Sequence, residues 1–250
     1  MLGASQRAGR VVDLEARARA GTPVLRRTSS GTAATVKERA LVFALALPSV
    51  SALAADASPR TLLNRNLRGF LRGFSRSGGP AAYFGREHIV KAKVPIALVG
   101  YEVTPAGAVL VEVIANLEGS LATDDPLDLA TTVLASIASW AKVETRAAPA
   151  PDLARPASPI TRPDDPMPLG FVAGPTRAVP IGLLDTGVGP GSGAVWLGGD
   201  ALVPGFVLRA FAAGDSLEPG SFPLDGATTA DLEGALASVR EGWRAPGSAP

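Results

Sequence analysis

Cysteine is absent from the 250-residue sequence, and histidine occurs only once, as His88. The lack of cysteine excludes a disulfide framework, thiolate metal ligands and a cysteine nucleophile. One imidazole is too few for a zinc site, and a Ser-His-Asp triad would have to use His88. We therefore expect no metal site and interpret His88 as a structural or incidental residue.

The sequence also lacks an excess of charge of one sign, with 24 Lys and Arg against 23 Asp and Glu and a formal net charge of +1. This balance argues against a nucleic-acid partner. No apolar run reaches the roughly 20 residues that a membrane helix needs, and residues 1–10 lack the apolar centre of a signal peptide. We therefore expect no membrane segment and a cytoplasmic location.

The hydrophobic fraction of 46% indicates a globular chain with a substantial core. Residues 146–168 hold seven prolines and few apolar side chains that could enter a core, which is typical of a linker or a long surface loop. We expect one folded domain over residues 1–145, a linker over 146–168 and a second folded domain over 169–250.

Apolar periodicity predicts the elements of the first domain. Thr104 to Gly107 is suited to a turn in an antiparallel hairpin, which we expect at the centre of the sheet. Asp125 and Pro126 are typical of a helix start, and Ser58 with Pro59 is a second such signal. We expect strands over residues 41–47, 94–103 and 108–115 and helices over 11–20, 59–74 and 125–140.

The second domain is expected to be small and to contain both strands and helices. Short apolar runs predict strands over residues 178–184 and 193–197, with a glycine-rich turn before the second. That turn lacks the Lys-Ser/Thr ending of a P-loop, so we interpret it as a hairpin loop. Helices are expected over residues 204–212 and 228–243.

Residues 26–33 read Arg-Arg-Thr-Ser-Ser-Gly-Thr-Ala, between two apolar runs. Backbone N–H groups of such a turn can face an anion, while the two guanidinium groups can form bidentate contacts with phosphate or carboxylate. This chemistry suits a nucleotide or acyl-adenylate pocket. An ordinary surface hairpin is the alternative interpretation of the same residues.

The residues around this loop resemble the catalytic domain of the lipoate–protein ligase and biotin–protein ligase superfamily. Gly21 to Leu25 resembles the strand before the family's arginine loop, and a segment containing Gly85 and Arg86 leads to the lysines Lys91 and Lys93. The Gly-Asp block at 195–200 is similar to the accessory domain of lipoate ligases and favours that branch over biotin ligation.

Three departures from the family pattern are visible. Ser30-Gly31-Thr32 stands where the family has three glycines, no glycine follows the lysines, and Thr35 to Glu38 replaces a His-Asp pair. The segment that begins at Leu2 is preceded in the family by a further strand and helix, so we expect either a start codon placed too late or a reduced ligand wall.

The resemblance implies an α+β fold, with a mixed, largely antiparallel sheet packed with helices and a small α+β accessory domain at the C-terminus. It implies ATP-dependent activation of lipoate or octanoate, with Mg²⁺, and transfer to a lysine of a lipoyl carrier domain. That carrier would be part of a 2-oxoacid dehydrogenase or the H protein of glycine cleavage. The alternative is a catalytically impaired homologue that binds an acyl cofactor or a carrier domain without turnover.

The resemblance also assigns roles to particular residues. Lys93 is the candidate catalytic lysine, and Lys91 is the alternative, because both would share a strand face if 91–93 were extended. Charged edge-strand lysines that oppose aggregation are the competing interpretation of this pair. The implied ligand-binding residues are Arg26, Arg27, Ser29, Ser30, Gly31, Gly85 and Arg86.

Overall fold

The computed structural model describes residues 1–115, 125–146, 166–190, 193–218 and 220–242. Two antiparallel sheets form its frame, one with the strand order β1-β5-β4-β3-β2 and one with the order β6-β7-β8. The strands of the first sheet are β1 (Leu41–Leu47), β2 (Ala81–Tyr83), β3 (His88–Lys91), β4 (Val94–Val103) and β5 (Val109–Ala115). Those of the second are β6 (Val172–Ala178), β7 (Leu183–Val188) and β8 (Val195–Gly199).

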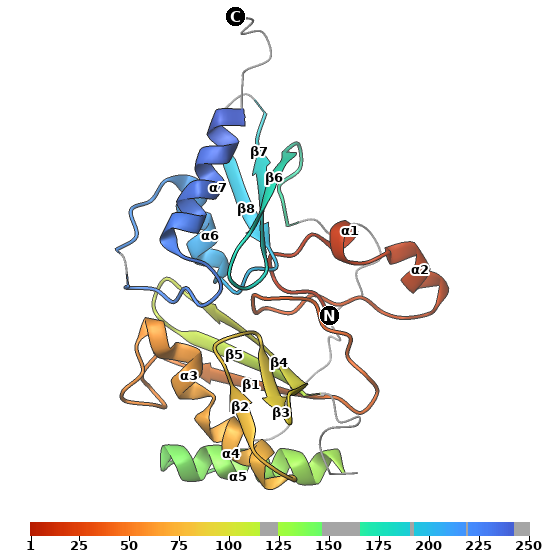
Figure 1. Cartoon of the computed structure of the whole chain (residues 1–250), viewed down its shortest axis with the longest axis vertical. Helices are drawn as coiled ribbons and strands as arrows, with labels where there is room; N and C mark the ends of the chain where they lie inside the picture. The colour runs from red at the N-terminus through yellow and green to blue at the C-terminus, as the bar shows by residue number, and fades with distance from the viewer. Residues whose placement is uncertain (116–124, 147–165, 191–192, 219, 243–250) are drawn as a thin grey trace, which may run out of the picture.

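Helices pack against both sheets (Figure 1). The first part of the chain holds α1 (Ala8–Val11), α2 (Leu14–Arg19), the 3-10 turn η1 (Pro59–Thr61), α3 (Leu62–Asn66), α4 (Arg68–Arg76) and α5 (Pro126–Ala141). The second sheet is packed by α6 (Gly205–Ala213) and α7 (Thr229–Gly242). This mixed α+β architecture, built on antiparallel sheets, is the one predicted from the sequence.

The helices α4 and α5 cover one face of the five-stranded sheet and approach each other closely. A Cβ added at Gly69 would lie 2.8 Å from the Ile137 Cα, and one at Gly73 would lie 2.7 Å from the Val133 Cα. The two glycines therefore permit this helix crossing. Phe43 of β1 meets the rings of two α4 phenylalanines edge to face on the same side of the sheet.

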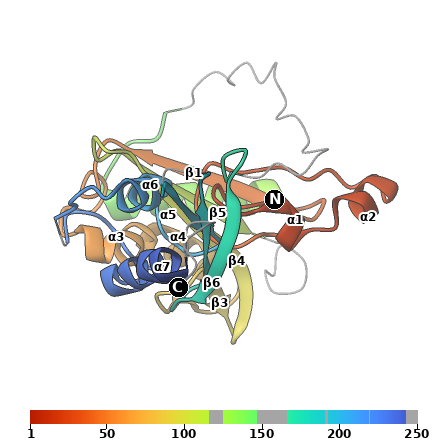
Figure 2. The ribbon, with the colours of Figure 1, turned by 90° about the horizontal axis from the view of Figure 1, so that it is seen from above.

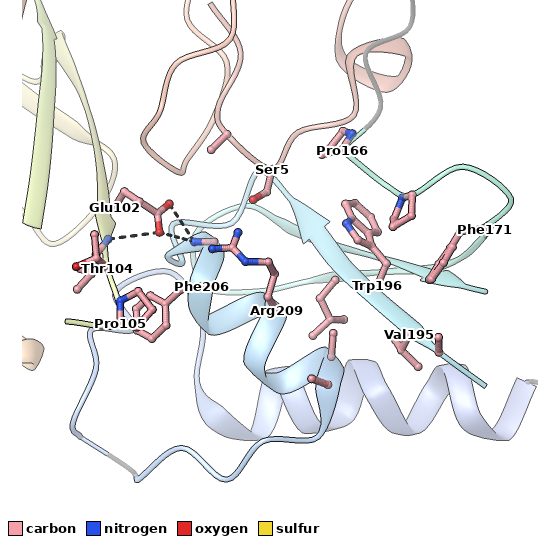
Figure 3. A pocket seen from close by; sticks show the side chains of 18 of the residues that line it. Ser5, Glu102, Thr104, Pro105, Pro166, Phe171, Val195, Trp196, Phe206 and Arg209 are labelled. Carbon is pink, nitrogen blue, oxygen red and sulfur yellow. Dashed lines mark hydrogen bonds between the residues drawn. The ribbon is translucent and has the colours of Figure 1, made fainter. Parts of the chain in front are cut away.

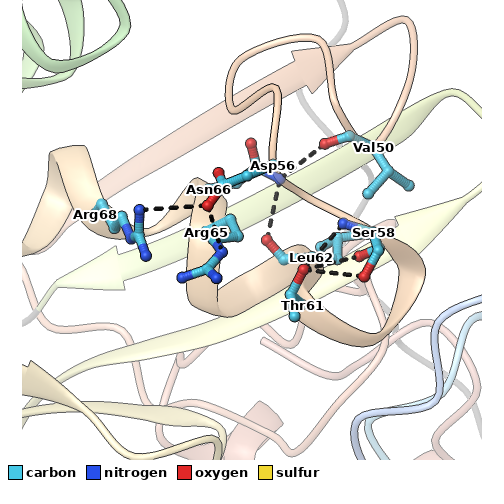
Figure 4. A network of polar contacts seen from close by, with 8 residues as sticks. All are labelled: Val50, Asp56, Ser58, Thr61, Leu62, Arg65, Asn66 and Arg68. Carbon is cyan, nitrogen blue, oxygen red and sulfur yellow. Dashed lines mark hydrogen bonds and ion pairs between the residues drawn. The ribbon is translucent and has the colours of Figure 1, made fainter.

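A polar network fixes the segment before α3 (Figure 4). The buried Asn66 amide donates to the carbonyls of Val50 and Leu62 at 3.1 and 3.0 Å. Arg65 forms an ion pair with Asp56, with the Nε and Oδ2 atoms 2.9 Å apart. The expected single helix over 59–74 is thus a series of three shorter elements, of which α3 and α4 contribute buried apolar side chains and η1 contributes none.

The other face of the sheet is defined by the strand register. Ala44, Glu112 and Gly100 form a row across β1, β5 and β4, next to the row of Phe43, Val113 and Val99 that faces the helices. Because side chains alternate between faces along a strand, the first row lies on the face away from α4 and α5. Ser29 reaches this face, where its N–H donates to the Glu112 carboxylate.

The helices α1 and α2 lie to one side of the two sheets (Figure 1 and Figure 2). The Asp13 carboxylate caps α2 by accepting from the Ala16 N–H at 2.9 Å. The guanidinium of Arg10 forms an ion pair with Asp185 of β7 and donates to the hydroxyl of Thr176 of β6. The N-terminal segment that contains α1 is therefore attached to the three-stranded sheet.

One predicted strand is wrong, and most of the predicted linker lies outside the described residues. The strand predicted over 178–184 is wrong, because the chain turns between β6 and β7 and Gly182 has a φ of +95° there. The helices α5, α6 and α7 lie where they were predicted. Residues 147–165, most of the predicted linker, lie outside the described residues.

Candidate functional site

The predicted ligand-binding loop lies directly on the five-stranded sheet. The N–H and the hydroxyl of Ser30 both donate to the Tyr101 carbonyl, at 2.9 and 2.6 Å, beyond the point where β3 stops pairing with β4. The Ser29 N–H donates to the Glu112 carboxylate at 2.9 Å. A Cβ at Gly100 would lie 2.5 Å from the Ser29 hydroxyl oxygen, so the glycine provides the space that the loop occupies.

Arg26 holds the N-terminal segment against this loop. Its Nη1 atom donates to the carbonyls of Gly3, Ala4 and Gln6 at 2.8, 3.2 and 2.7 Å. The backbone adds a bond from Ala4 N–H to Ser29 O at 2.9 Å. Much of the hydrogen-bonding capacity of Arg26 is therefore used within the protein.

Arg27 is buried beneath the loop, with 4% of its surface exposed. Its Nη2 atom donates to the Ser30 carbonyl at 3.0 Å, whereas Nε and Nη1 have no hydrogen-bond partner among the described residues. Burial lowers the pKa of Arg27 to about 10, against the opposing effect of the Glu112 charge. Arg27 thus keeps two unpaired donors beside Gly31, where the chain has a φ of +100°.

The two candidate lysines lie at the far end of the same strands. Ala92 and Lys93 have φ values of +50° and +67° and form the tight turn between β3 and β4. Residues 91–93 are therefore not extended, contrary to the expectation. Gly100 follows Val94 by six positions along β4, so this turn is about 20 Å along the strand from the loop.

Lys91 is directed away from the loop. It is buried on the same face of β3 as Ile89, which packs in the core with α4 and α5. Its ammonium donates to the Ser77 carbonyl after α4 at 2.6 Å, and burial lowers the pKa of Lys91. The structure brings neither lysine to Ser29, Ser30 and Gly31, and their catalytic role stays a prediction.

Gly85 and Arg86 lie in an exposed turn between β2 and β3. Gly85 adopts a φ of +72°, and an added Cβ there would meet no atom within 4 Å. The backbone carbonyl of Glu87, two residues after Gly85, accepts a hydrogen bond from the Val99 N–H at 2.7 Å. The Val99 carbonyl in turn lies beside Gly31. The turn is thus near the loop end of the sheet, while its role in ligand binding stays a prediction.

A cavity of about 900 Å³ opens between the two sheets, next to the loop at Thr28. Its volume is within the range typical of ligand pockets. We call it the inter-sheet cavity. Its walls come from the N-terminal segment, from the end of β4, from the segment that precedes β6, and from the elements β8, α6 and α7. Its charged lining residues are Glu102, Arg209 and Arg240.

The inter-sheet cavity has a polar end and an apolar end (Figure 3). Glu102, Arg209 and Thr104 lie with Pro105 and Phe206 at the end near β4 and the start of α6, whereas Trp196 and Phe171 lie at the other end, which has no charged side chain among the labelled residues. Such a distribution suits a ligand with a polar head and an apolar body.

Glu102 is committed to the first turn of α6. Its two carboxylate oxygens accept from the Gly205 N–H at 2.8 and 3.0 Å, which satisfies a donor at the helix N-terminus. Burial raises the pKa of Glu102, and the hydrogen bond from Gly205 and the charge of Arg209 oppose that rise.

Tyr101 joins the loop to the segments that precede α6 and α7. While its carbonyl holds Ser30, its fully buried hydroxyl donates to the Leu202 carbonyl at 3.3 Å and accepts from the Asp225 N–H at 3.4 Å. Burial raises the pKa of Asp225 to about 7, an effect that the proximity of Tyr101 opposes. Asp225 Oδ2 and the hydroxyl of Tyr83 have no hydrogen-bond partner among the described residues.

Sequence reasoning missed Glu102, Arg209, Tyr101 and Asp225. The first two belong to one cavity although about a hundred positions separate them, so no local spacing marks them. Within the described ranges, no group of three or more His, Asp or Glu residues is placed to hold a metal ion. No helix in those ranges is both long enough and apolar enough to cross a bilayer.

No protein-family profile matches the sequence, and no curated protein matches it. Solved structures do match. LipL1 of P. falciparum, crystallised in complex with lipoate, shares 12% sequence identity and superposes with a TM-score of 0.60, covering 88% of this chain and 74% of LipL1. Ta0514 of T. acidophilum, a candidate lipoate protein ligase with bound lipoic acid, shares 14% identity with a TM-score of 0.46, covering 58% of this chain and 69% of that one. The likeness to LipL1 is one of fold, and the chain has a lipoate–protein ligase-like fold.

Proposed function

We propose that this protein is a lipoate–protein ligase-like protein that binds lipoate or octanoate and transfers it to a lysine of a lipoyl carrier domain. The observation that carries the proposal is the fold shared with LipL1 over 88% of the chain, together with the Arg26–Gly31 loop seated on β4 in the order that the sequence resemblance predicts. The carrier would be the lipoyl domain of a 2-oxoacid dehydrogenase or the H protein.

The proposed reaction has two steps. A carboxylate oxygen of the acyl acid attacks the α-phosphorus of ATP and releases pyrophosphate, with Mg²⁺ entering on the nucleotide. The carrier lysine then attacks the acyl carbonyl, forms an amide and releases AMP and a proton. The protein would contribute orientation and electrostatic stabilisation. The unpaired Nε and Nη1 donors of Arg27 fit a negative group that reaches the loop.

A second candidate function is binding of the acyl acid or carrier domain without turnover. Its specific support is that Arg26 and Ser30 donate to backbone carbonyls within the protein, while Lys93 lies at a turn about 20 Å along the strand from the loop. In that case the fold keeps a ligand pocket but has lost the cationic groups of the ligase reaction.

Intact-mass analysis of an apo lipoyl domain separates the two functions. The domain is incubated with the protein, ATP, Mg²⁺ and either lipoate or octanoate, and a parallel titration calorimetry experiment measures binding of each acid. A mass gain of one acyl group establishes the ligase. Binding without a mass gain and without pyrophosphate establishes the second function, and absence of both overturns the proposal.

The role of Lys93 is tested in the same assay. Lys93→Ala is expected to abolish acyl transfer in an active ligase without unfolding the protein, because Lys93 is exposed. Lys142→Ala is a matched control, since Lys142 is also an exposed lysine with a positive φ of 56°. Full activity of Lys93→Ala removes Lys93 from the mechanism.

A further inference from the structure

The inter-sheet cavity contains a cation, Arg209, whose charge acts on Glu102 but which has no hydrogen-bond or ion-pair partner among the described residues. Arg209 is exposed on α6 and makes no hydrogen bond or ion pair with another described residue. A Cβ added at Gly205 would lie 3.2 Å from its Nη1 atom, so the guanidinium lies over the first turn of the helix, inside the cavity wall. Its fork of N–H donors is available to a planar anion.

The neighbouring acid, Glu102, interacts with this cation through its charge but without a direct ion pair. Both oxygens of Glu102 accept from the Gly205 N–H, and no ion pair within 4.0 Å joins Glu102 to Arg209 among the described residues. Glu102 thus serves the helix terminus, where a carboxylate is stabilised by the aligned backbone dipoles. Arg209 is left to face the cavity at the polar end (Figure 3).

The apolar end is shaped by a tryptophan that lies along β8. A Cβ added at Gly198 would be 2.1 Å from Trp196 Cη2, so the indole lies directly over that glycine. A Cβ at Gly187 of β7 would be 3.6 Å from the Trp196 Cε3. The two glycines let the ring lie against the sheet and present an apolar surface to the cavity, next to Phe171 (Figure 3).

We propose that Arg209 binds the carboxylate of the acyl acid through its guanidinium fork while the hydrocarbon chain lies along Trp196. This inference rests on the proposed function and deepens it, because it places acid recognition on the second part of the chain. In this proposal the carboxylate of the acid is bound by Arg209 and not by Arg27 of the sequence-predicted loop. A neutral acyl amide of the same length keeps the chain contact and loses the charge contact.

Titration calorimetry with octanoate and octanamide tests this assignment. The wild-type protein is expected to prefer octanoate, and Arg209→Gln is expected to weaken octanoate binding about 10- to 100-fold and leave octanamide unchanged. Trp196→Ala is expected to weaken both ligands about 10-fold, because it removes apolar contact from either chain. Arg72→Gln, an exposed arginine of α4 outside the cavity, is the matched control.

The possible outcomes separate the two proposals. If wild-type protein binds octanoate and Arg209→Gln binds it equally well, the Arg209 assignment is overturned and the proposed function stands. The assignment also fails if Arg27→Gln, shown to be folded by its melting curve, is the variant that loses the preference for the acid. If the wild-type protein binds neither lipoate nor octanoate, both proposals fall.

Discussion

Thr28 and Ser30 lie two residues apart, yet Thr28 is exposed on the inter-sheet cavity while Ser30 is buried against β4. The loop around Ser30 is closed: its N–H, its hydroxyl and its carbonyl all have protein partners. The cavity is open, and the Arg209 guanidinium on its wall has no hydrogen-bond or ion-pair partner among the described residues. The residues that carry the family resemblance and the residues best placed to meet a ligand are thus largely different sets.

This difference predicts that substitutions in the loop change stability, whereas substitutions on the cavity wall change binding. The largest expected effect is at Gly100. Gly100→Val would place a Cβ 2.5 Å from the Ser29 hydroxyl oxygen and 2.6 Å from the Ser30 carbonyl oxygen, so the loop must leave the sheet. We expect a loss of about 3 kcal/mol in the free energy of unfolding, measured by urea denaturation.

Gly9→Ala is the control for that substitution, because an added Cβ at Gly9 would meet nothing within 4 Å. It is expected to stay within about 0.5 kcal/mol of the wild-type protein. A Gly100→Val protein as stable as the wild type would mean that the loop is not held on the sheet.

The next largest effect is expected at Asp225, whose backbone N–H donates to the Tyr101 hydroxyl. The folded protein keeps a proton on Asp225 up to pH about 7, whereas the unfolded chain releases it near the ordinary pKa of 3.8. Between these values the folded state binds more protons, so the free energy of unfolding falls as the pH rises from 4 to 7 and levels off above 7. The groups near this carboxyl group are the hydroxyls of Tyr101 and Tyr83, and the charge of Glu87 contributes to raising the pKa of Tyr83.

Asp225→Asn should remove this part of the pH dependence. We expect the wild-type protein to lose on the order of 2 kcal/mol of stability relative to the variant between pH 5 and pH 8. Urea denaturation of both proteins across that range measures the difference. Parallel curves for the two proteins would show that Asp225 titrates as an ordinary exposed acid.

The elements predicted correctly are those with local start and stop signals. Asp125 caps α5 by accepting from the Leu127 N–H at 2.8 Å, as the Asp-Pro pair indicated. The hairpin of β4 and β5 turns at the predicted residues 104–107. In contrast, the apolar run 178–184 contains a turn at Gly182 that its hydrophobic pattern does not indicate. Ala92 and Lys93 form a turn without the glycine or asparagine that usually marks one.

The site was less accessible to sequence reasoning than the fold. The loop was found because its residues are consecutive, but the partners that bury it, Tyr101 and Glu112, lie more than seventy positions away. The cavity wall combines residues from both sheets, which only tertiary packing brings together. Arg209 belongs to a helix whose sequence pattern reports its apolar face and gives no information about the cavity.

A finer contrast lies within the loop itself. Ser30→Ala removes the hydroxyl that donates to the Tyr101 carbonyl at 2.6 Å, while the backbone bond to the same oxygen remains. We expect a loss of about 1 kcal/mol in the free energy of unfolding. Thermal denaturation measures the loss, and an unchanged melting temperature would contradict it.

Thr28→Ala is expected to have the smallest effect on stability, within about 0.5 kcal/mol of the wild-type protein, because Thr28 is exposed and its side chain makes no hydrogen bond with another described residue. Its position on the cavity predicts instead a change in the affinity for octanoate, measured by calorimetry beside Ser30→Ala. If Ser30→Ala, still folded, lowers the affinity more than Thr28→Ala does, then the closed loop opens to the ligand, and the separation between a structural loop and a binding cavity does not hold.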